Sequence, residues 1–333
     1  MQKERIDFID LAKGFCIILV VMGHCDVANS IPGFNFLRMP LFFILSGLFF
    51  KPYNGFLNFA IQKTNKILIP FLFFYCISYF LFYLIEAFYP AIMVTSARGI
   101  EDMFTNRQFF NGPIWFLLCL YWGNLLFYIV YISFKKEVFR TLSVLIIGFI
   151  GFYLGYKDFF LPLFIDVAFT ALPFYYIGYL LKKSPILYPS KYDRWSFIFI
   201  FFLYGISAIL EHSFSMKLLF QYNDIKGCML PYIAAICSVL VILLLCKKIK
   251  KIAFISYIGR YSIVVLCLHH LVYRPLKVLF KLFDISFLNN SYTLFIITLI
   301  ICYFLIPLCI KYIPYFTAQK NLIKPPPPKK MDS

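Results

Sequence analysis

The residues best suited to chemistry are ionisable side chains inside long apolar stretches, and the first such stretch holds three of them. Asp10, Lys13 and His24 all fall within the segment RIDFIDLAKGFCIILVVMGH. Ionisable groups are costly inside a membrane, so each one is a candidate for function. If the segment is a helix, Lys13 and His24 share a face, because eleven residues make about three turns, and they lie roughly 16 Å apart along its axis. Asp10 precedes Lys13 by three residues and lies near the same face.

This spacing suits a long donor molecule with a phosphorylated head and a reactive far end. Acyl-CoA has that shape: its anionic phosphates would lie at Lys13, and its pantetheine arm would bring the thioester to His24. Histidine titrates near neutral pH, so His24 can act as a general base toward an acceptor hydroxyl. The alternatives are that His24 only hydrogen-bonds between helices and that Lys13 is a snorkelling anchor.

Four other charged residues lie where they could serve the same chemistry. Asp166 is expected at about the depth of His24, where it either orients the imidazole or forms an ion pair with a base in an outer loop. Arg38 is either an anchor at the outer face or a contact for a glycan. Lys63 and Lys66 either hold the donor phosphates or simply follow the positive-inside rule.

Two aromatic motifs complete the set of candidates. Trp115, in NGPIWFLLCLYWGN, belongs either to an interfacial aromatic belt or to a surface that stacks on a sugar ring. His269 and His270 form a pair that could bind a metal, but no carboxylate or third histidine lies nearby in the sequence. The ten cysteines are scattered through apolar runs without CxxC spacing. We therefore predict no metal site.

The composition requires that lipid cover much of the chain. Hydrophobic residues make up 62% of the 333 and charged residues only 14%, and the mean hydropathy is +0.81. A soluble domain is roughly 45–50% apolar and about 25% charged. The net charge of +17 does not indicate nucleic-acid binding, because the basic residues lie between apolar runs instead of on one soluble face. We expect an all-α, polytopic integral membrane protein.

About ten transmembrane helices follow from apolar stretches of sufficient length. They are expected near 11–30, 36–50, 67–88, 113–133, 142–156, 160–181, 196–211, 228–246, 261–280 and 292–313. With the N-terminus inside, most of the 32 Lys and Arg residues fall in inner segments, as the positive-inside rule requires. Both termini are therefore predicted to be cytoplasmic. The predicted organisation is one transmembrane domain, 1–315, and a proline- and lysine-rich cytoplasmic tail, 316–333, without a core of its own.

Several motifs, in order along the chain, resemble those of the acyltransferase family 3 membrane proteins, especially the branch similar to fucose 4-O-acetylases. The motifs are RIDFIDLAKGFCIILVVMGH, FLRMPLFFILSGLFF, QKTNKILIP, GPIWFLLCL, the segment from Asp166 to Gly178, and IGRYSIVVLCLHH. Residues that match the family pattern are Arg5, Asp10, Lys13, Gly14, His24, Met39, Pro40, Phe42, Phe43, Ser46, Gly47, Lys63, Lys66, Pro70, Trp115, Gly259, Ser262 and His269.

The resemblance implies transfer of an acyl group, usually acetyl, from cytoplasmic acetyl-CoA to a sugar hydroxyl of a surface polysaccharide or its lipid-linked precursor. It implies that His24 is catalytic and that basic residues on the cytoplasmic side bind the donor. Our own expectation is that Asp166 supports His24. Acetyl-CoA is then a co-substrate, and no other cofactor is expected. Arg38, Trp115, His269 and Ser46 are expected to bind the acceptor or to have structural roles. The implied location is a bacterial inner membrane.

Two other classes of protein fit the same residues. A transporter or flippase of a glycan or lipid intermediate would use the intramembrane charges as a translocation path. A non-catalytic scaffold in a polysaccharide-synthesis complex would need none of them for chemistry. The shared face of Lys13 and His24, and the lack of an evident internal repeat, favour the enzyme.

Overall fold

The computed structural model describes residues 7–25, 27, 36–88, 104, 107, 109–182, 184, 196–213, 217–226, 230–285, 288 and 290–324. Nearly all of this is helical, so the expected all-α fold is confirmed. The long helices are α1 (Asp7–His24), α4 (Ile69–Phe88), α6 (Trp115–Ser133), α7 (Glu137–Tyr156), α8 (Ile165–Leu181), α9 (Ser196–Ser213), α10 (Leu230–Ile249), α12 (Ser262–Leu282) and α13 (Ser291–Tyr312). The shorter ones are α2 (Arg38–Leu48), α3 (Phe56–Lys63) and α11 (Ala253–Arg260), with a π-helix, η1 (Thr64–Leu68), joining α3 to α4.

Within the described residues, three 3₁₀ turns and one hairpin lie between these helices. The turns are η2 (Gly112–Ile114), η3 (Pro162–Phe164) and η6 (Phe220–Tyr222). Strands β1 (Lys217–Leu219) and β2 (Asp224–Lys226) pair antiparallel around η6, with Leu218 opposite Ile225. The sequence did not predict this hairpin, because each strand has only three residues.

Seven helical segments of the described chain are long and apolar enough to cross a membrane, and they make it a multi-pass membrane protein. Each predicted span contains a helix, but the third helical segment begins earlier than expected and runs as one unit over Phe56–Phe88. The first helix ends at His24, and residues 26 and 28–30 of its predicted span lie outside the described residues. The count of ten spans and the cytoplasmic position of both termini stay predictions.

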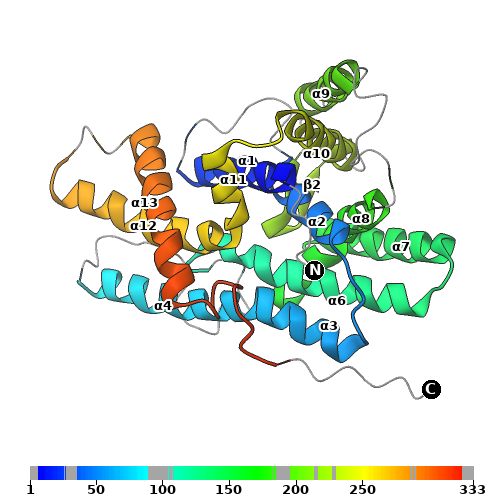
Figure 1. Cartoon of the computed structure of the whole chain (residues 1–333), viewed down its shortest axis with the longest axis horizontal. Helices are drawn as coiled ribbons and strands as arrows, with labels where there is room; N and C mark the ends of the chain where they lie inside the picture. The colour runs from blue at the N-terminus through cyan, green and yellow to red at the C-terminus, as the bar shows by residue number, and fades with distance from the viewer. Residues whose placement is uncertain are drawn as a thin grey trace.

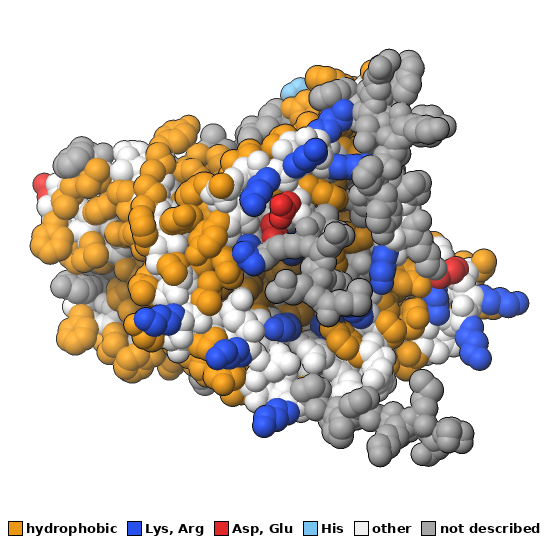
Figure 2. All heavy atoms as spheres, viewed as in Figure 1, with side chains coloured by type: hydrophobic (Ala, Val, Ile, Leu, Met, Phe, Trp, Pro, Cys, Tyr) orange, Lys and Arg blue, Asp and Glu red, His pale blue; other side chains and the backbone are white. Residues whose placement is uncertain are grey.

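The outer surface of the bundle is apolar, as a lipid environment requires. On α7, the side chains of Leu142, Leu145, Ile146 and Phe149 are all at least half exposed. Their spacing places them on one face of the helix. Figure 2 shows apolar side chains covering much of the visible face. A patch of this extent in an aqueous protein would mark an interaction surface, and here lipid is the natural cover.

Two groups of helices meet at the centre of the molecule (Figure 1). Helix α1 packs against α10, α11 and α12, while α8 packs against α2, α6 and α7. Contacts between α1 and α2 join the two groups. One continuous apolar core includes residues from both, among them Cys16, Phe43 and Phe174. Helix α1 is therefore held on several sides, which fixes the position of any side chain at its end.

Motif glycines allow the closest helix crossings. A Cβ added to Gly14 on α1 would collide with the backbone of Ile255 on α11, and one added to Gly259 would collide with the backbone of Asp10. In the same way, a Cβ added to Gly47 on α2 would collide with the backbone of α8, and one added to Gly178 on α8 would collide with the backbone of α2. Small residues let helix backbones approach closely in membranes. The glycines of the sequence motifs thus set how α1 and α2 lie in the bundle.

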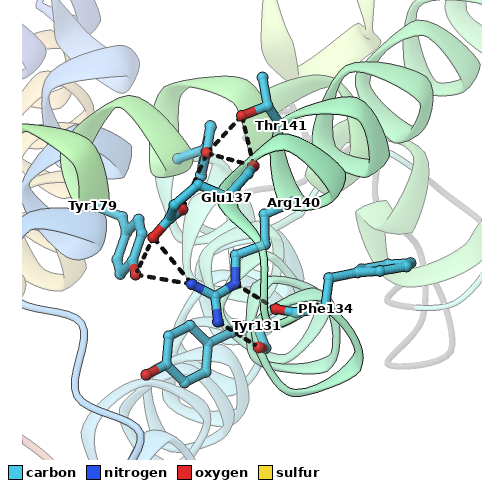
Figure 3. Close-up of polar contacts among 7 residues, drawn as sticks. Tyr131, Phe134, Glu137, Arg140, Thr141 and Tyr179 are labelled. Atoms are coloured by element: carbon cyan, nitrogen blue, oxygen red, sulfur yellow. Dashed lines mark hydrogen bonds and ion pairs between the residues drawn. The ribbon is translucent and has the colours of Figure 1, made fainter.

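A polar cluster fixes the turn between α6 and α7 to the end of α8 (Figure 3). The Arg140 guanidinium donates to the carbonyls of Phe134 (2.7 Å) and Tyr131 (3.1 Å) and to the Glu137 carboxylate (3.1 Å). Its Nη1 also donates to the Tyr179 hydroxyl at 3.3 Å. Charge-assisted hydrogen bonds of this kind are among the stronger ones in proteins. Arg140 therefore has a structural role.

The chain after α13 folds back onto η1 and α4. Buried Asn65 exchanges two hydrogen bonds of 2.8 Å with the backbone of Ile323, and the rings of Phe73 and Phe316 stack at 4.1 Å. Part of the segment predicted as a tail without a core of its own, 316–324, is thus packed against the helices. Residues 325–333 lie outside the described residues.

Candidate active site

A cavity of about 160 Å³ lies where α1 ends and α2 and α6 begin. Three of its lining residues were candidates from the sequence: His24, Arg38 and Trp115. The remaining lining residues are Val20, Phe36, Met39, Pro40, Leu218, Leu219, Phe220, Gln221 and Tyr222. The fold therefore brings an imidazole, a guanidinium and an indole to one concave surface. Pockets that combine an apolar lining with a few polar groups are the usual sites for small ligands.

Each of the three side chains is placed by the start or the end of a helix. His24 is the last residue of α1, and Arg38 is the first residue of α2. The Cys16 thiol donates to the Arg38 carbonyl at 2.9 Å, which ties the start of α2 to α1. Trp115 is the first residue of α6, preceded by the turn Gly112–Ile114 with proline in its first positions. The Trp115 ring is buried and packs at 5.5 Å from Phe164, so it belongs to the cavity wall.

His24 also meets the histidine pair of α12. The ring centroids of His24 and His270 are 4.6 Å apart, those of His24 and His269 are 5.3 Å apart, and those of His269 and His270 are 5.1 Å apart. One nitrogen from each ring lies within 4.8 Å of the others. The prediction of no metal rested on the absence of a third histidine or a carboxylate near the pair in the sequence. In the fold, His24 reaches the pair from the other end of the chain.

The segment before α6 helps to hold this part of α12. Buried Asn111 donates to the carbonyl of Cys267 at 2.8 Å, and Gly112 lies against the ring of His270. The same short segment leads into Trp115. It therefore links the cavity wall to the histidine pair.

Asp166 has the ion pair that was one of its two predicted roles. Its carboxylate pairs with the Arg107 guanidinium at 2.5 Å and accepts a hydrogen bond from the Asn223 side chain at 3.1 Å. Arg107 also donates to the carbonyl of Gln221, and the Gln221 side chain donates to the carbonyl of Arg107. Because Gln221 lines the cavity, Asp166 supports the cavity wall through Arg107. These contacts give it a partner other than His24.

Ser46 belongs to a polar contact between helices. Its hydroxyl lies 3.2 Å from the Asn124 amide nitrogen, and the Tyr175 hydroxyl donates to the Asn124 amide oxygen at 2.9 Å. The three residues lie on α2, α6 and α8, so Ser46 helps to join these helices. Of the two roles expected for Ser46, these contacts support the structural one.

The three lysines proposed for the donor have different surroundings. Lys13 Nζ lies 5.5 Å from the centroid of the Phe49 ring, directly after α2, and Lys63 Nζ lies 5.3 Å from that of Phe59. The Phe59 ring packs against Phe50, the residue next to Phe49. Lys13 and Lys63 therefore flank the C-terminal end of α2, whereas His24 shares a cavity with its N-terminal end. Lys66 instead donates to the carbonyl of Ala318 at 2.5 Å.

Sequence reasoning missed three contributors to this region. The hairpin places Gln221 and Tyr222 in the cavity wall, and Arg107 supplies the partner of Asp166. The charge of Arg274, one helical turn after His270, acts on His24. Arg274 carried a usable signal, because it lies in a predicted apolar span, but the hairpin and Arg107 lie in connecting segments without a recognisable motif.

Comparisons with known proteins give one finding. Residues 6–313 match the model of a family described as an acyltransferase domain, which is nearly the whole chain. A search of curated proteins and a search of solved structures each found no match.

Proposed function

The chain belongs to acyltransferase family 3, and from this premise we propose that it transfers an acetyl group from acetyl-CoA to a sugar hydroxyl. The acceptor would be a surface polysaccharide or its lipid-linked precursor, in a bacterial inner membrane. That the chain is a membrane acyltransferase follows from its family and its apolar helices. The donor, the acceptor and the roles of single residues are the proposal.

The observation that carries the proposal is the position of His24. It is the last residue of α1, on the wall of a cavity shared with Arg38 and Trp115. Lys13 lies on the same helix, roughly 16 Å back along the axis. This separation leaves room for a pantetheine arm between a phosphate group at Lys13 and a thioester at His24.

The reaction needs one proton acceptor and a way to stabilise negative charge. His24 removes the proton from the acceptor hydroxyl, and the oxygen attacks the thioester carbonyl carbon. The carbon–sulfur bond of the resulting tetrahedral intermediate then breaks, and the leaving thiolate receives the proton from His24. The Arg38 guanidinium, on the same cavity wall, would stabilise the negative oxygen of the intermediate. The part of Trp115 that lines the cavity would stack on the acceptor sugar.

The donor head would bind at the opposite end of α2. Lys13 and Lys63 flank that end, and both are suited to phosphate as point charges. Lys66 has a backbone carbonyl as one partner, and its ammonium group has further donors for a phosphate. Helix α1 would therefore bind the donor head at its Lys13 end and carry out the transfer at its His24 end.

The test combines cells and purified protein. In cells that lack this protein, the O-acetyl content of the surface glycan would be measured by NMR after complementation with wild type, His24→Ala or His212→Ala. His212 is an exposed histidine on α9 and serves as the matched control. We expect wild type and His212→Ala to restore the acetyl signal and His24→Ala, at equal expression, to leave it absent.

Two results would contradict the proposal. If His24→Ala restores acetylation as well as wild type does, His24 is not the base. If wild type never adds acetyl to the glycan, and purified protein transfers no label from acetyl-CoA, the donor or acceptor assignment is wrong.

A further inference from the structure

Three of the four histidines in the chain converge on one point. His269 and His270 are buried on α12, and His24 lies between them and the cavity that it lines. One nitrogen of each ring lies within 4.8 Å of the other two. The steps of the proposed transfer use neither of the two buried histidines.

The hydrogen bond made by His269 fixes which of its nitrogens is available. Its Nδ1 lies 2.9 Å from the carbonyl oxygen of Val265. A carbonyl can only accept, so Nδ1 carries the proton and Nε2 has the free lone pair. Histidines that bind metals usually donate their other ring N–H to a carbonyl or carboxylate in this way. His269 therefore has the tautomer and the orientation of a metal ligand.

The free nitrogens have no other use within the described residues. Neither Nε2 of His269 nor Nδ1 of His270 has a hydrogen-bond partner there, and both atoms are buried. Buried polar atoms without a partner are costly, so these two atoms point to an occupant. A single atom bound by one nitrogen of each ring would give the three side chains a common partner.

We propose that His24, His269 and His270 bind one divalent transition-metal ion. Imidazole nitrogen suits Zn²⁺, whereas Mg²⁺ and Ca²⁺ prefer oxygen ligands. Three histidines with an open fourth position form a known type of zinc site. The fourth position would face the cavity, because His24 is the member of the triad that lines it.

To bind one zinc ion, the three ring nitrogens must move slightly closer together. Zinc–nitrogen bonds of about 2.0–2.1 Å in a tetrahedral site place the ligand nitrogens about 3.3 Å from one another. The three nitrogens lie at most 4.8 Å apart, so small rotations of the rings close the site. The charges of Arg38 and Arg274 both act on His24. Their positive charge opposes a dication at this place, and it favours an anion, such as hydroxide or chloride, as a fourth ligand that reduces the net charge of the site.

Metal binding would also affect acyl transfer. Only this predicted effect rests on the proposed function. A neutral imidazole has one lone pair, so a metal-bound His24 cannot accept a proton from a hydroxyl. The metal-loaded chain would therefore be an inhibited form of the enzyme. The metal site itself is tested without any measurement of acyl transfer.

The experiment uses the full chain in lipid nanodiscs, purified through a tag that contains no histidine. The protein is stripped with a chelator, titrated with Zn²⁺, and its bound zinc is measured by mass spectrometry. The variants are His269→Gln and His270→Gln, and His212→Gln is the matched control, since that side chain is exposed on α9. X-ray absorption then identifies the ligands of the bound zinc.

We expect wild type and His212→Gln to bind one zinc per chain, through imidazole nitrogens at about 2.0–2.1 Å. Either triad variant should weaken zinc binding by at least about tenfold, since even the loss of an outer-shell partner costs about 10–100-fold. The proposal is overturned if stripped wild type binds no stoichiometric zinc, a result that does not depend on whether any variant folds. It is also overturned if folded triad variants, judged by size-exclusion profile and thermal unfolding, bind zinc as tightly as wild type.

Discussion

Replacing Lys13 with Ala should raise the KM for acetyl-CoA and leave kcat nearly unchanged. Lys13 Nζ lies beside the Phe49 ring at the donor end of α1, roughly 16 Å along the helix from His24. A hydrogen bond to a charged group is worth about 1.5–3 kcal/mol, so the loss corresponds to about a 10- to 150-fold increase in KM. Because the phosphate contact is the same in the bound substrate and the transition state, kcat should not follow.

The assay compares two donors, and this removes the effect of any general damage to the protein. Acetyl-CoA carries the phosphates, whereas S-acetylpantetheine carries the same thioester without them. With acetyl-CoA, Lys13→Ala should show the full increase in KM, and with S-acetylpantetheine it should behave as wild type does. The matched control is Lys157→Ala, because Lys157 Nζ also lies near an aromatic ring, 5.4 Å from Tyr156, but at the end of α7. Lys157→Ala should change neither KM.

The reasoning would be refuted by an equal loss with both donors. That result would mean that Lys13 positions α1 and does not bind a phosphate. A fall in kcat with an unchanged KM would refute it as well, because the effect would then reach the reacting atoms. Higher ionic strength should reduce the difference between wild type and Lys13→Ala, since salt screens interactions of partly exposed charges.

Four further changes test other parts of the structure. Zn²⁺ should inhibit transfer and a chelator should restore it, since both the metal and the hydroxyl proton need the lone pair of His24; loss of activity on chelation would instead refute His24 as the base. Gly47→Leu should lower the unfolding temperature strongly, because overpacking costs about 1–3 kcal/mol or more, and an unchanged melting curve would contradict the close crossing of α2 and α8. Arg140→Ala should destabilise the protein by about 1–3 kcal/mol, because buried groups lose partners, while transfer per folded molecule stays as in wild type. Ser46→Ala should cost about 1 kcal/mol or less and leave KM for both substrates unchanged, and a rise in acceptor KM would show that Ser46 binds the acceptor.

The sequence predicted the long helices well because lipid imposes a strong local rule. A stretch of about 20 apolar residues is a signal that each span carries by itself, and α12 and α13 begin and end within two residues of their predicted bounds. The extension of the third span to Phe56 was missed because Asn65 and Lys66 interrupt the apolar run. In the fold, the C-terminal segment provides both of these polar side chains with backbone partners. Nothing near residue 65 in the sequence indicates a partner that lies about 250 residues away.

The sequence predicted several residues of the candidate site, but it did not predict which of them contact one another. Single residues such as His24, Arg38 and Trp115 were found because polar or aromatic groups stand out in apolar helices, and the structure places all three on one cavity wall. Which of two roles Asp166 has depends on the path of a connecting segment, which brings Arg107 to its carboxylate. Such paths have no local periodicity from which they could be predicted.

The histidine triad follows from one helix crossing, which explains how residues so distant in the sequence meet. Helix α1 meets the chain of α11 and α12 where Gly14 and Gly259 pack against each other's helices. His24 lies ten residues after Gly14 on the same helix, about 15 Å along its axis, whereas the chain from Gly259 to His269 leaves α11 at Tyr261 and continues as α12. The rings of His24 and His269 nevertheless meet. A shift of one residue at the crossing would rotate a helix by about 100° and turn its histidine away. The glycine crossing of α1 and α11, together with the break at Tyr261, therefore brings His24 and His269 together.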